Sequence, residues 1–206
     1  MDNYTSIMSK SGDVYAVINE VHKIAWNAVK ESSINRILYM TAVMYSFIEP
    51  HKQNVFKGDY NFIVTLSGPE DADIENALIN LESNYLIERG ENGFSVLVED
   101  AYESFDDIPL SKIKRTWIED IIYIIGIYGE DKIYDFIFRD PQYNTTFKSN
   151  SVSSLDIGKD NETVKFLFGF KAAFEENLEG GLETIEIRKY LEMYFEYIFG
   201  KILRGE

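Results

Sequence analysis

The chain has 206 residues, with 35 acidic against 20 basic side chains and a formal net charge of -15. This charge repels phosphate backbones and anionic lipid, so it disfavours nucleic acid and membrane surfaces as direct partners. The absence of cysteine excludes a disulfide framework, thiol catalysis and cysteine-ligated zinc. The first residues are polar and no apolar run approaches the ~20 residues that span a bilayer, so we expect a soluble cytoplasmic protein.

The first fifty residues predict two helices. Apolar residues recur at helical spacing behind Asp13, a good N-cap, and they predict a helix over residues 14–30. Ser33 is the expected N-cap of a second helix that runs through Phe47, shortly before Pro50. Each helix carries an apolar face, which is typical of a helix that packs on a core.

Strand and helix signals alternate in the next fifty residues. They predict a strand-like run at 62–66, a turn at Gly68-Pro69, a helix capped by Asp71 or Asp73, and a hairpin of runs 85–89 and 94–98. Helix, helix, strand, helix and hairpin is the order of a winged-helix domain. We therefore predict a mainly α fold of the α+β type, with a winged-helix-like domain at residues 1–105.

The second half of the sequence predicts helices rich in aromatic side chains. A helix is expected at 111–128, a shorter one at 132–138, and a mobile polar loop at about 144–163. Two further helices are expected on either side of Gly180-Gly181, and the last one is apolar almost all round. We predict that residues 106–206 form a helical, partner-binding region.

Enzyme signatures are weak in this sequence. Residues 66–70 resemble the signature loop of ABC-type ATPases only faintly, and no phosphate-binding glycine loop accompanies them. His22 and His51 lack the spacing of metal ligands. Residues 49–52 include an acidic residue and a lysine, as a magnesium nuclease site does, but they lie in an expected loop and not near a strand. Neighbouring acidic residues could act as a general acid and base, but in so acidic a chain such pairs are expected from composition alone, on a solvated face. We therefore predict no enzyme activity, no catalytic residue, no cofactor and no metal.

DNA binding is the usual function of a winged helix, and it needs cationic or amide side chains on the third helix. The expected third helix has no Lys or Arg, and its only plausible base readers are Asn76, Asn80 and Asn84. It also carries Asp71, Asp73, Glu75 and Glu82. The hairpin adds Arg89, but also Glu88 and Glu91. Negative charge turned toward phosphates opposes the counterion release that drives DNA affinity. We predict that this domain binds protein.

Three segments of the second half carry a family resemblance: residues 117–125, 128–130 and 132–143, which are rich in Ile, Tyr and Phe. Together with the Gly68-Pro69 turn, the helix and hairpin after it, and more loosely residues 166–171, they resemble the middle component of ABC-three-component systems. Such middle components resemble the small third subunit of Lamassu-type anti-phage systems. The resemblance implies a non-catalytic accessory subunit that binds an SMC-like ATPase and works with an effector subunit such as a nuclease. Together with the acidic third helix, this leads us to expect that DNA is contacted only through the complex.

A second resemblance keeps another class open. The run of helix, Gly-Pro turn, helix and hairpin is also similar to antitoxins of the SocA or Panacea type, which neutralise a toxin by binding it. A winged-helix DNA-binding regulator and a nuclease are further alternatives.

Aromatic side chains and one arginine form the predicted partner-binding set. Arg and Tyr are over-represented in interface hot spots, so we expect Tyr134, Arg139 and Tyr143 to face a partner. The alternative for Arg139 is an ion pair with Asp135 at helical spacing, before Pro141 ends the helix. The full set is Trp117, Tyr128, Tyr134, Arg139, Tyr143, Tyr190, Tyr194, Tyr197 and Phe199.

Overall fold

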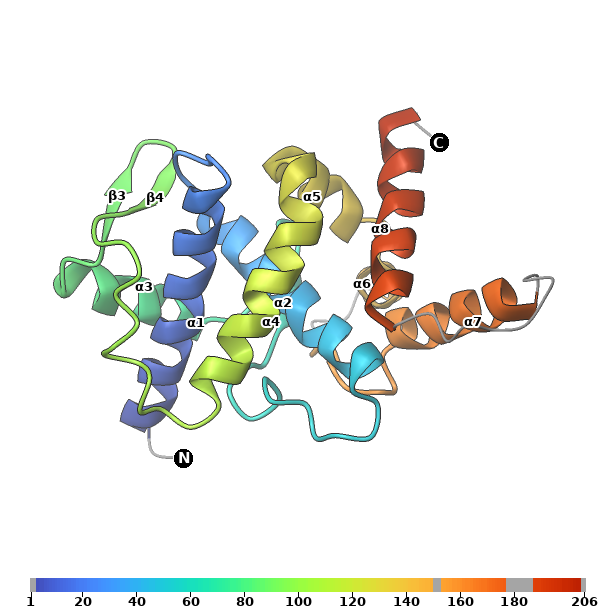
Figure 1. The fold of residues 1–206 in the computed structure, drawn as a ribbon, viewed down its shortest axis with the longest axis horizontal. Coiled ribbons are helices and arrows are strands. Elements are labelled where there is room, and N and C mark those ends of the chain that lie inside the picture. The colour runs from blue at the N-terminus through green and yellow to red at the C-terminus, as the bar shows by residue number, and fades with distance from the viewer. Residues whose placement is uncertain (1–2, 150–152, 177–186, 205–206) are drawn as a thin grey trace.

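The computed structural model describes residues 3–149, 153–176 and 187–204, and these residues are mainly helical, as the sequence predicts (Figure 1). Two small antiparallel sheets, each of two strands, accompany the helices in the described ranges. In chain order the elements are α1 (Asn3–Lys23), α2 (Glu31–Ile48), β1 (Ile63–Thr65), β2 (Gly68–Glu70), α3 (Asp73–Ser83), β3 (Ile87–Gly90), β4 (Gly93–Val96), α4 (Ser111–Ile125), the 3-10 turn η1 (Gly126–Tyr128), α5 (Glu130–Ile137), α6 (Pro141–Lys148), α7 (Glu162–Glu176) and α8 (Ile187–Arg204).

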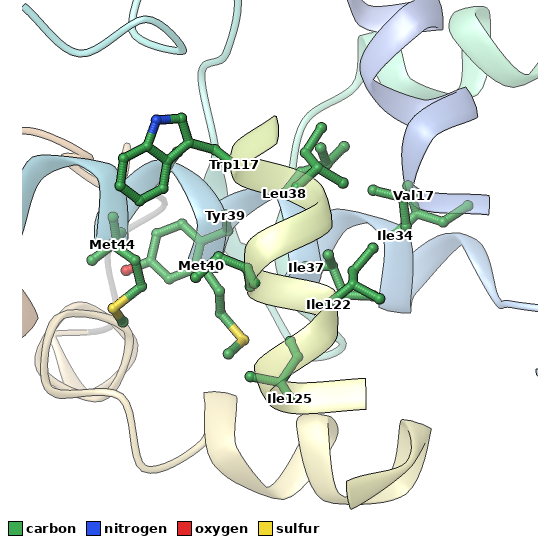
Figure 2. Packing of buried hydrophobic residues seen from close by; sticks show 14 of the residues in the cluster. Val17, Ile34, Ile37, Leu38, Tyr39, Met40, Met44, Trp117, Ile122 and Ile125 are labelled. Atoms are coloured by element: carbon green, nitrogen blue, oxygen red, sulfur yellow. The ribbon is translucent and has the colours of Figure 1, made fainter. Parts of the chain in front are cut away.

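Helix α2 lies at the centre of the fold. Every residue from Ser33 to Phe47 is buried. A helix with buried residues all round must be covered on several sides, and α1, α4, α5, α7 and α8 all pack against it. Figure 2 shows Ile37, Leu38 and Met40 of α2 next to side chains of α4. This central helix fixes the relative positions of the others.

The hydrophobic core continues across the predicted domain boundary at residue 105. Trp117, Ile122 and Ile125 of α4 pack beside the α2 residues, with Val17 of α1 nearby (Figure 2). In Figure 1, α4 lies between α1 and α8, and it contacts both. Residues 1–105 and 106–206 therefore share one apolar cluster, and the functional division between them stays a prediction.

A buried ionic cluster joins α1, α4 and the segment between α2 and α3. The Lys114 ammonium donates to Asp13 Oδ2 at 2.9 Å, to Ser9 Oγ at 2.9 Å, and to Asp59. The hydroxyl of Tyr60 donates to the same Asp13 oxygen at 2.9 Å. Lone buried charges are costly, so these groups must be held together by their partners.

Two predicted helix starts are wrong. Helix α1 begins at Asn3, so Asp13 lies inside it and is not its N-cap. The Asp13 carboxylate accepts hydrogen bonds from the side chains of Lys114 and Tyr60. Ser33 lies within the first turn of α2, whose N-cap position is Lys30. Short polar residues serve equally as caps and as buried partners, and spacing alone does not separate the two.

The loop predicted at 144–163 is wrong at its two ends, where α6 and the first residues of α7 lie, whereas residues 153–161 lie outside the helices and named strands. Helix α6 occupies Pro141–Lys148, and Asp140 caps it by accepting a hydrogen bond from the Tyr143 amide at 2.8 Å. Pro141 therefore begins a helix, as its fixed φ allows at a first position, besides following the end of α5. Further on, Leu155 and Ile157 are buried, and the Leu155 amide donates to the Phe62 carbonyl at 2.7 Å.

Both short hairpins differ in detail from the predicted pattern. Gly68 and Pro69 lie in strand β2, which pairs with β1. The turn is therefore at Leu66 and Ser67, two residues earlier than predicted. The second hairpin is confirmed, with β3 and β4 in the register Gly90↔Gly93 and a short connection at Glu91 and Asn92. Residue Val29, between α1 and α2, adds a bridge to Phe94 of β4.

Candidate functional site

Helix α3 exposes an acidic face. Its apolar residues Ile74, Ala77, Leu78 and Leu81 are buried, largely against α1. Asp73, Glu75 and Asn76 are exposed on the outer side. Asp73 is paired with Lys10 at 2.8 Å, which lowers the pKa of its carboxyl and keeps it ionised. Helix α3 contributes no Lys or Arg of its own, so its outer surface presents negative charge, which Lys10 of α1 offsets at Asp73.

The asparagines proposed as possible base readers are partly engaged within the chain. The Asn80 amide donates to Ser11 Oγ of α1 at 3.0 Å. The Asn84 amide donates to the Asn80 carbonyl at 2.8 Å. Asn76 stays exposed beside Glu75. Asn76 and Asn84 are exposed, whereas Asn80 is held partly buried against α1.

The hairpin after α3 is fastened to the start of α2. The Val29 amide donates to the Phe94 carbonyl at 3.0 Å, and the Phe94 amide donates back to the Val29 carbonyl at 2.9 Å. Arg89 lies over the Phe94 ring, 4.6 Å from its centroid, and contacts Glu82 of α3 at 3.3 Å. Glu88 and Glu91 are exposed on the same hairpin. The one cation of the hairpin is therefore accompanied by acids.

An apolar groove lies between α4, η1 and α8, with the residue after α1 at its edge. It has a volume of about 480 Å³ and is lined by Ile24, Tyr123, Ile124, Ile127, Tyr128, Glu192 and Glu196. We call it the α4–α8 groove. Tyr123 is 78% exposed and Ile127 is 80% exposed, although both side chains are largely apolar. An adjoining recess is lined by Trp117, Asp120, Ile121 and Leu191, among others.

Most of the predicted partner residues of α4, η1 and α8 are buried or half-buried in the described structure. Trp117, Tyr190, Tyr194 and Phe199 are buried. Tyr128 is half-buried and stacks on Phe199 with ring centroids 4.0 Å apart. Of these five side chains, Tyr128 lines the α4–α8 groove, and Tyr190 and Tyr194 pack against rings of α5 and α7. Their partner role stays a prediction.

Tyr197 differs from the other aromatic residues of α8. It is exposed, and the Lys201 ammonium lies 4.6 Å from its ring centroid. A cation held over an exposed ring is a typical surface arrangement. Of the predicted residues on α8, Tyr197 is the one presented to solvent in the described structure.

Tyr134 and Tyr143, two of the predicted partner-facing residues, lie near each other in the structure. Tyr134 is exposed, and the Arg36 guanidinium lies 4.7 Å from its ring centroid. Phe138 contacts both tyrosine rings, with centroid distances of 4.6 and 5.3 Å. Tyr143 is buried and donates to the Thr65 carbonyl at 2.5 Å. A partner on this side would therefore meet Tyr134 first.

Arg139 is exposed at the end of α5. Asp135, its proposed intrahelical partner, forms an ion pair with Lys132 at 3.1 Å. The partner role of Arg139 stays a prediction.

Sequence reasoning missed Ile24, Tyr123 and Ile127. Tyr123 and Ile127 lie off the apolar stripe that predicts the buried face of α4, and Ile24 was expected inside a longer first helix. The available signal was that apolar residues of this segment extend beyond one helical face, which is typical of a second contact surface.

Candidate metal sites and membrane-spanning helices are absent from the described ranges. No group of three or more His, Cys, Asp or Glu side chains there could hold a metal ion. None of the helices in those ranges combines the length and hydropathy needed to cross a bilayer. His22 lies 3.4 Å from Glu99, and His51 is exposed. Comparison of the chain with protein-family models, with curated proteins and with solved structures finds no match.

Proposed function

We propose that this chain is a non-catalytic accessory subunit of a cytoplasmic, SMC-like ATPase complex of the Lamassu anti-phage type. It docks on the ATPase and helps to restrain or couple an effector nuclease. It reaches DNA only through the complex. The family resemblance of residues 117–143 supports the class of complex, and the surface chemistry supports a protein-binding function.

The order of elements supports a winged-helix-like domain for residues 1–105. Helices α1, α2 and α3 precede the β3–β4 hairpin, and Val29 adds a third extended segment to that hairpin. The β1–β2 hairpin is then an insertion between α2 and α3. In such a domain α3 takes the place of the recognition helix, and the β3–β4 hairpin takes the place of the wing.

The observation that carries the proposal is the charge of α3. A recognition helix reads DNA through cations and amides, whereas the outer side of α3 carries Asp73 and Glu75 and has no Lys or Arg. Each carboxylate brought near phosphate adds repulsion instead of releasing a counterion. A polypeptide partner with basic side chains suits this face better than a duplex does.

Co-purification tests the proposal directly. The tagged full chain is expressed with its neighbouring genes, and we expect it to retain a large SMC-like ATPase and an effector. Recovery of a small toxin without an ATPase would support the antitoxin alternative instead. A strictly monomeric chain that retains none of these products would contradict both.

DNA binding by the isolated chain provides the second test. Fluorescence anisotropy with labelled duplex at low and at physiological salt should give no tight binding. Tight, salt-sensitive binding would contradict the proposal, because it would require cationic contacts that α3 does not offer.

A further inference from the structure

We infer that the α4–α8 groove binds an amphipathic helix of a partner protein, with an apolar face inserted in the groove and Lys or Arg along its flanks. This inference rests on the proposed protein-binding function and names the chemistry of the partner at one surface. Helix-in-groove binding is a common mode of protein recognition, in which apolar anchors recur at i, i+3 or i+4, and i+7.

The floor of the groove is apolar and open. Ile24 follows α1, whereas Ile124 and Ile127 lie on the continuous segment of α4 and η1, and Tyr123 adds a large aromatic surface. Single exposed apolar residues are ordinary, but a contiguous, concave set is characteristic of an interaction site. Tyr and Ile side chains with a high exposed fraction gain most when a partner covers them.

The rim of the groove is acidic. Glu192 and Glu196 lie one helical turn apart on α8 and line the groove, and Asp120 of α4 lines the adjoining recess. Glu192 also pairs with Lys189 at 2.6 Å, an exposed contact that a partner cation can share or replace. Acidic side chains along the α8 wall of an apolar groove favour an occupant with cations beside its apolar face.

Other segments of the chain itself fit this rim poorly. Residues 177–186, which lie outside the described ranges, contain Glu179, Glu183 and Glu186 and no Lys or Arg. A second copy in a two-fold dimer would set the same acidic rim against itself. Both occupants would add like-charge repulsion, so the charges favour a different protein with basic flanks.

A designed peptide of about 18 residues serves as the probe, with Leu at i, i+3 or i+4 and i+7 and Lys on both flanks. The labelled peptide is titrated with the full chain at physiological salt and followed by fluorescence anisotropy. We expect Ile127→Ser and Tyr123→Ser each to weaken binding by about tenfold, as central anchors of an interface do.

Two exposed residues outside the groove provide matched controls. Leu66 is 81% exposed and Tyr85 is 78% exposed, close to the values for Ile127 and Tyr123. Leu66→Ser and Tyr85→Ser should leave peptide affinity unchanged. If these variants weaken binding as much as the groove variants do, or if no variant changes it, the peptide binds by general charge attraction and the inference is wrong.

The acidic rim is tested by the double variant Glu192→Gln and Glu196→Gln. We expect it to weaken binding by roughly fivefold at low salt and by less at high salt, because salt screens exposed charges. A peptide with Glu in place of Lys should bind at least about tenfold more weakly than the Lys peptide. Equal affinity for the two peptides would overturn the charge part of the inference.

Oligomeric state separates the remaining occupant. Sedimentation of the full chain should give the same mass for the unmodified chain and Ile127→Ser. A dimer that Ile127→Ser abolishes and Leu66→Ser preserves would assign the groove to a second copy and overturn the inference.

The groove inference and the proposed function can be contradicted independently of each other. If Ile127→Ser and Glu196→Gln co-purify with the ATPase as well as the unmodified chain does, the groove inference fails while the proposed function stands. If the peptide binds in the groove and no ATPase or effector co-purifies, the proposed complex is wrong although the groove binds a basic helix.

Discussion

Lys114 and Asp13 are 101 residues apart in the sequence, yet the ammonium of one donates to the carboxylate of the other at 2.9 Å inside the core. The side chains are 1% and 2% exposed. Burial raises the pKa of Asp13, because the attraction of a shared ammonium offsets only part of the lost hydration. Burial alone would lower the pKa of Lys114, but Asp13 and Asp59 together outweigh it and raise this pKa.

Removing the ammonium should therefore destabilise the fold strongly. In Lys114→Met the carboxylates of Asp13 and Asp59 remain buried without their cation, and we expect a loss of about 3–5 kcal/mol in the free energy of unfolding. Urea unfolding followed by circular dichroism measures this loss. Lys165→Met is the control, because Lys165 pairs with Glu162 at 2.8 Å on the surface and should have almost no effect.

A triple variant with Asp13→Asn, Asp59→Asn and Lys114→Met tests the reason for this loss. It removes all three charges, so it should recover part of the stability that Lys114→Met loses. If Lys114→Met alone unfolds at the same urea concentration as the unmodified chain, the cluster contributes nothing and the argument is wrong.

The same cluster predicts loss of stability at alkaline pH. Burial raises the pKa of Tyr60 well above its ordinary value of 10.0, and nearby Asp13 raises it further. The pKa of Lys114 is raised above its ordinary value of 10.5. Groups with a raised folded pKa stabilise fully below the unfolded pKa and lose this contribution as pH rises through the folded value.

The free energy of unfolding should thus fall as pH rises above about 10, by about 1.4 kcal/mol per pH unit for each retained proton. Tyr60→Phe removes one of these protons, so its stability should fall less steeply over the same range. Urea unfolding at a series of alkaline pH values measures both slopes. Equal slopes for the two chains would contradict the role of the Tyr60 hydroxyl.

Helical spacing alone predicts much of this fold. It places the central helix at 33–47, where the structure has Glu31–Ile48, and the Trp117 helix at 111–128, where α4 and η1 occupy Ser111–Ile125 and Gly126–Tyr128. These helices have clear apolar faces, and the apolar side chains need no particular partner to be buried. The pattern is therefore visible without knowledge of the neighbours.

The start of α1 could not be predicted in this way. Residues Ser9, Lys10 and Ser11 look like an exposed polar segment, yet all three are buried. Lys10 is paired with Asp71 at 2.6 Å, and Ser9 donates to Asp59 at 3.0 Å. Burial of polar groups depends on partners that are distant in sequence, and the same holds for the α4–α8 groove, whose acidic wall comes from α8.

Substitution of Asp140 should also destabilise the fold. Its carboxylate accepts hydrogen bonds from the Tyr143 amide at 2.8 Å, the Thr163 hydroxyl at 2.6 Å and the Tyr39 hydroxyl at 3.2 Å. Asp140→Ala leaves buried donors without a partner and removes the cap of α6, so we expect a loss of roughly 2–4 kcal/mol.

Asp140→Asn is the informative companion variant. Burial raises the pKa of Asp140, which means that its charge is costly in this position. The amide oxygen of Asn can still accept from the Tyr143 amide, so this variant should lose clearly less stability than Asp140→Ala. Thermal unfolding of the two variants side by side measures the difference. A loss as large as that of Asp140→Ala would mean that the charge itself is needed.

A pair of glycines gives opposite predictions for the same substitution. Gly93 has a φ of +127°, and a Cβ there would lie 2.4 Å from the Val29 carbonyl oxygen. Gly93→Ala should therefore disturb the bridge between Val29 and Phe94 and cost roughly 2–3 kcal/mol. Gly169 lies inside α7, and a Cβ there would meet nothing within 4 Å. Gly169→Ala should stabilise the fold by about 0.5–1 kcal/mol, because it restricts the unfolded chain and favours helix.

Urea unfolding of both glycine variants decides between backbone strain and general loss of flexibility. If flexibility alone mattered, both substitutions would stabilise the chain. The opposite signs are expected because Gly93 combines a positive φ with a close approach to Val29, whereas Gly169 is an ordinary helix position with open space around it. Amide hydrogen exchange at Phe94 adds a local measure, since its amide donates to the Val29 carbonyl at 2.9 Å and should lose protection in Gly93→Ala alone.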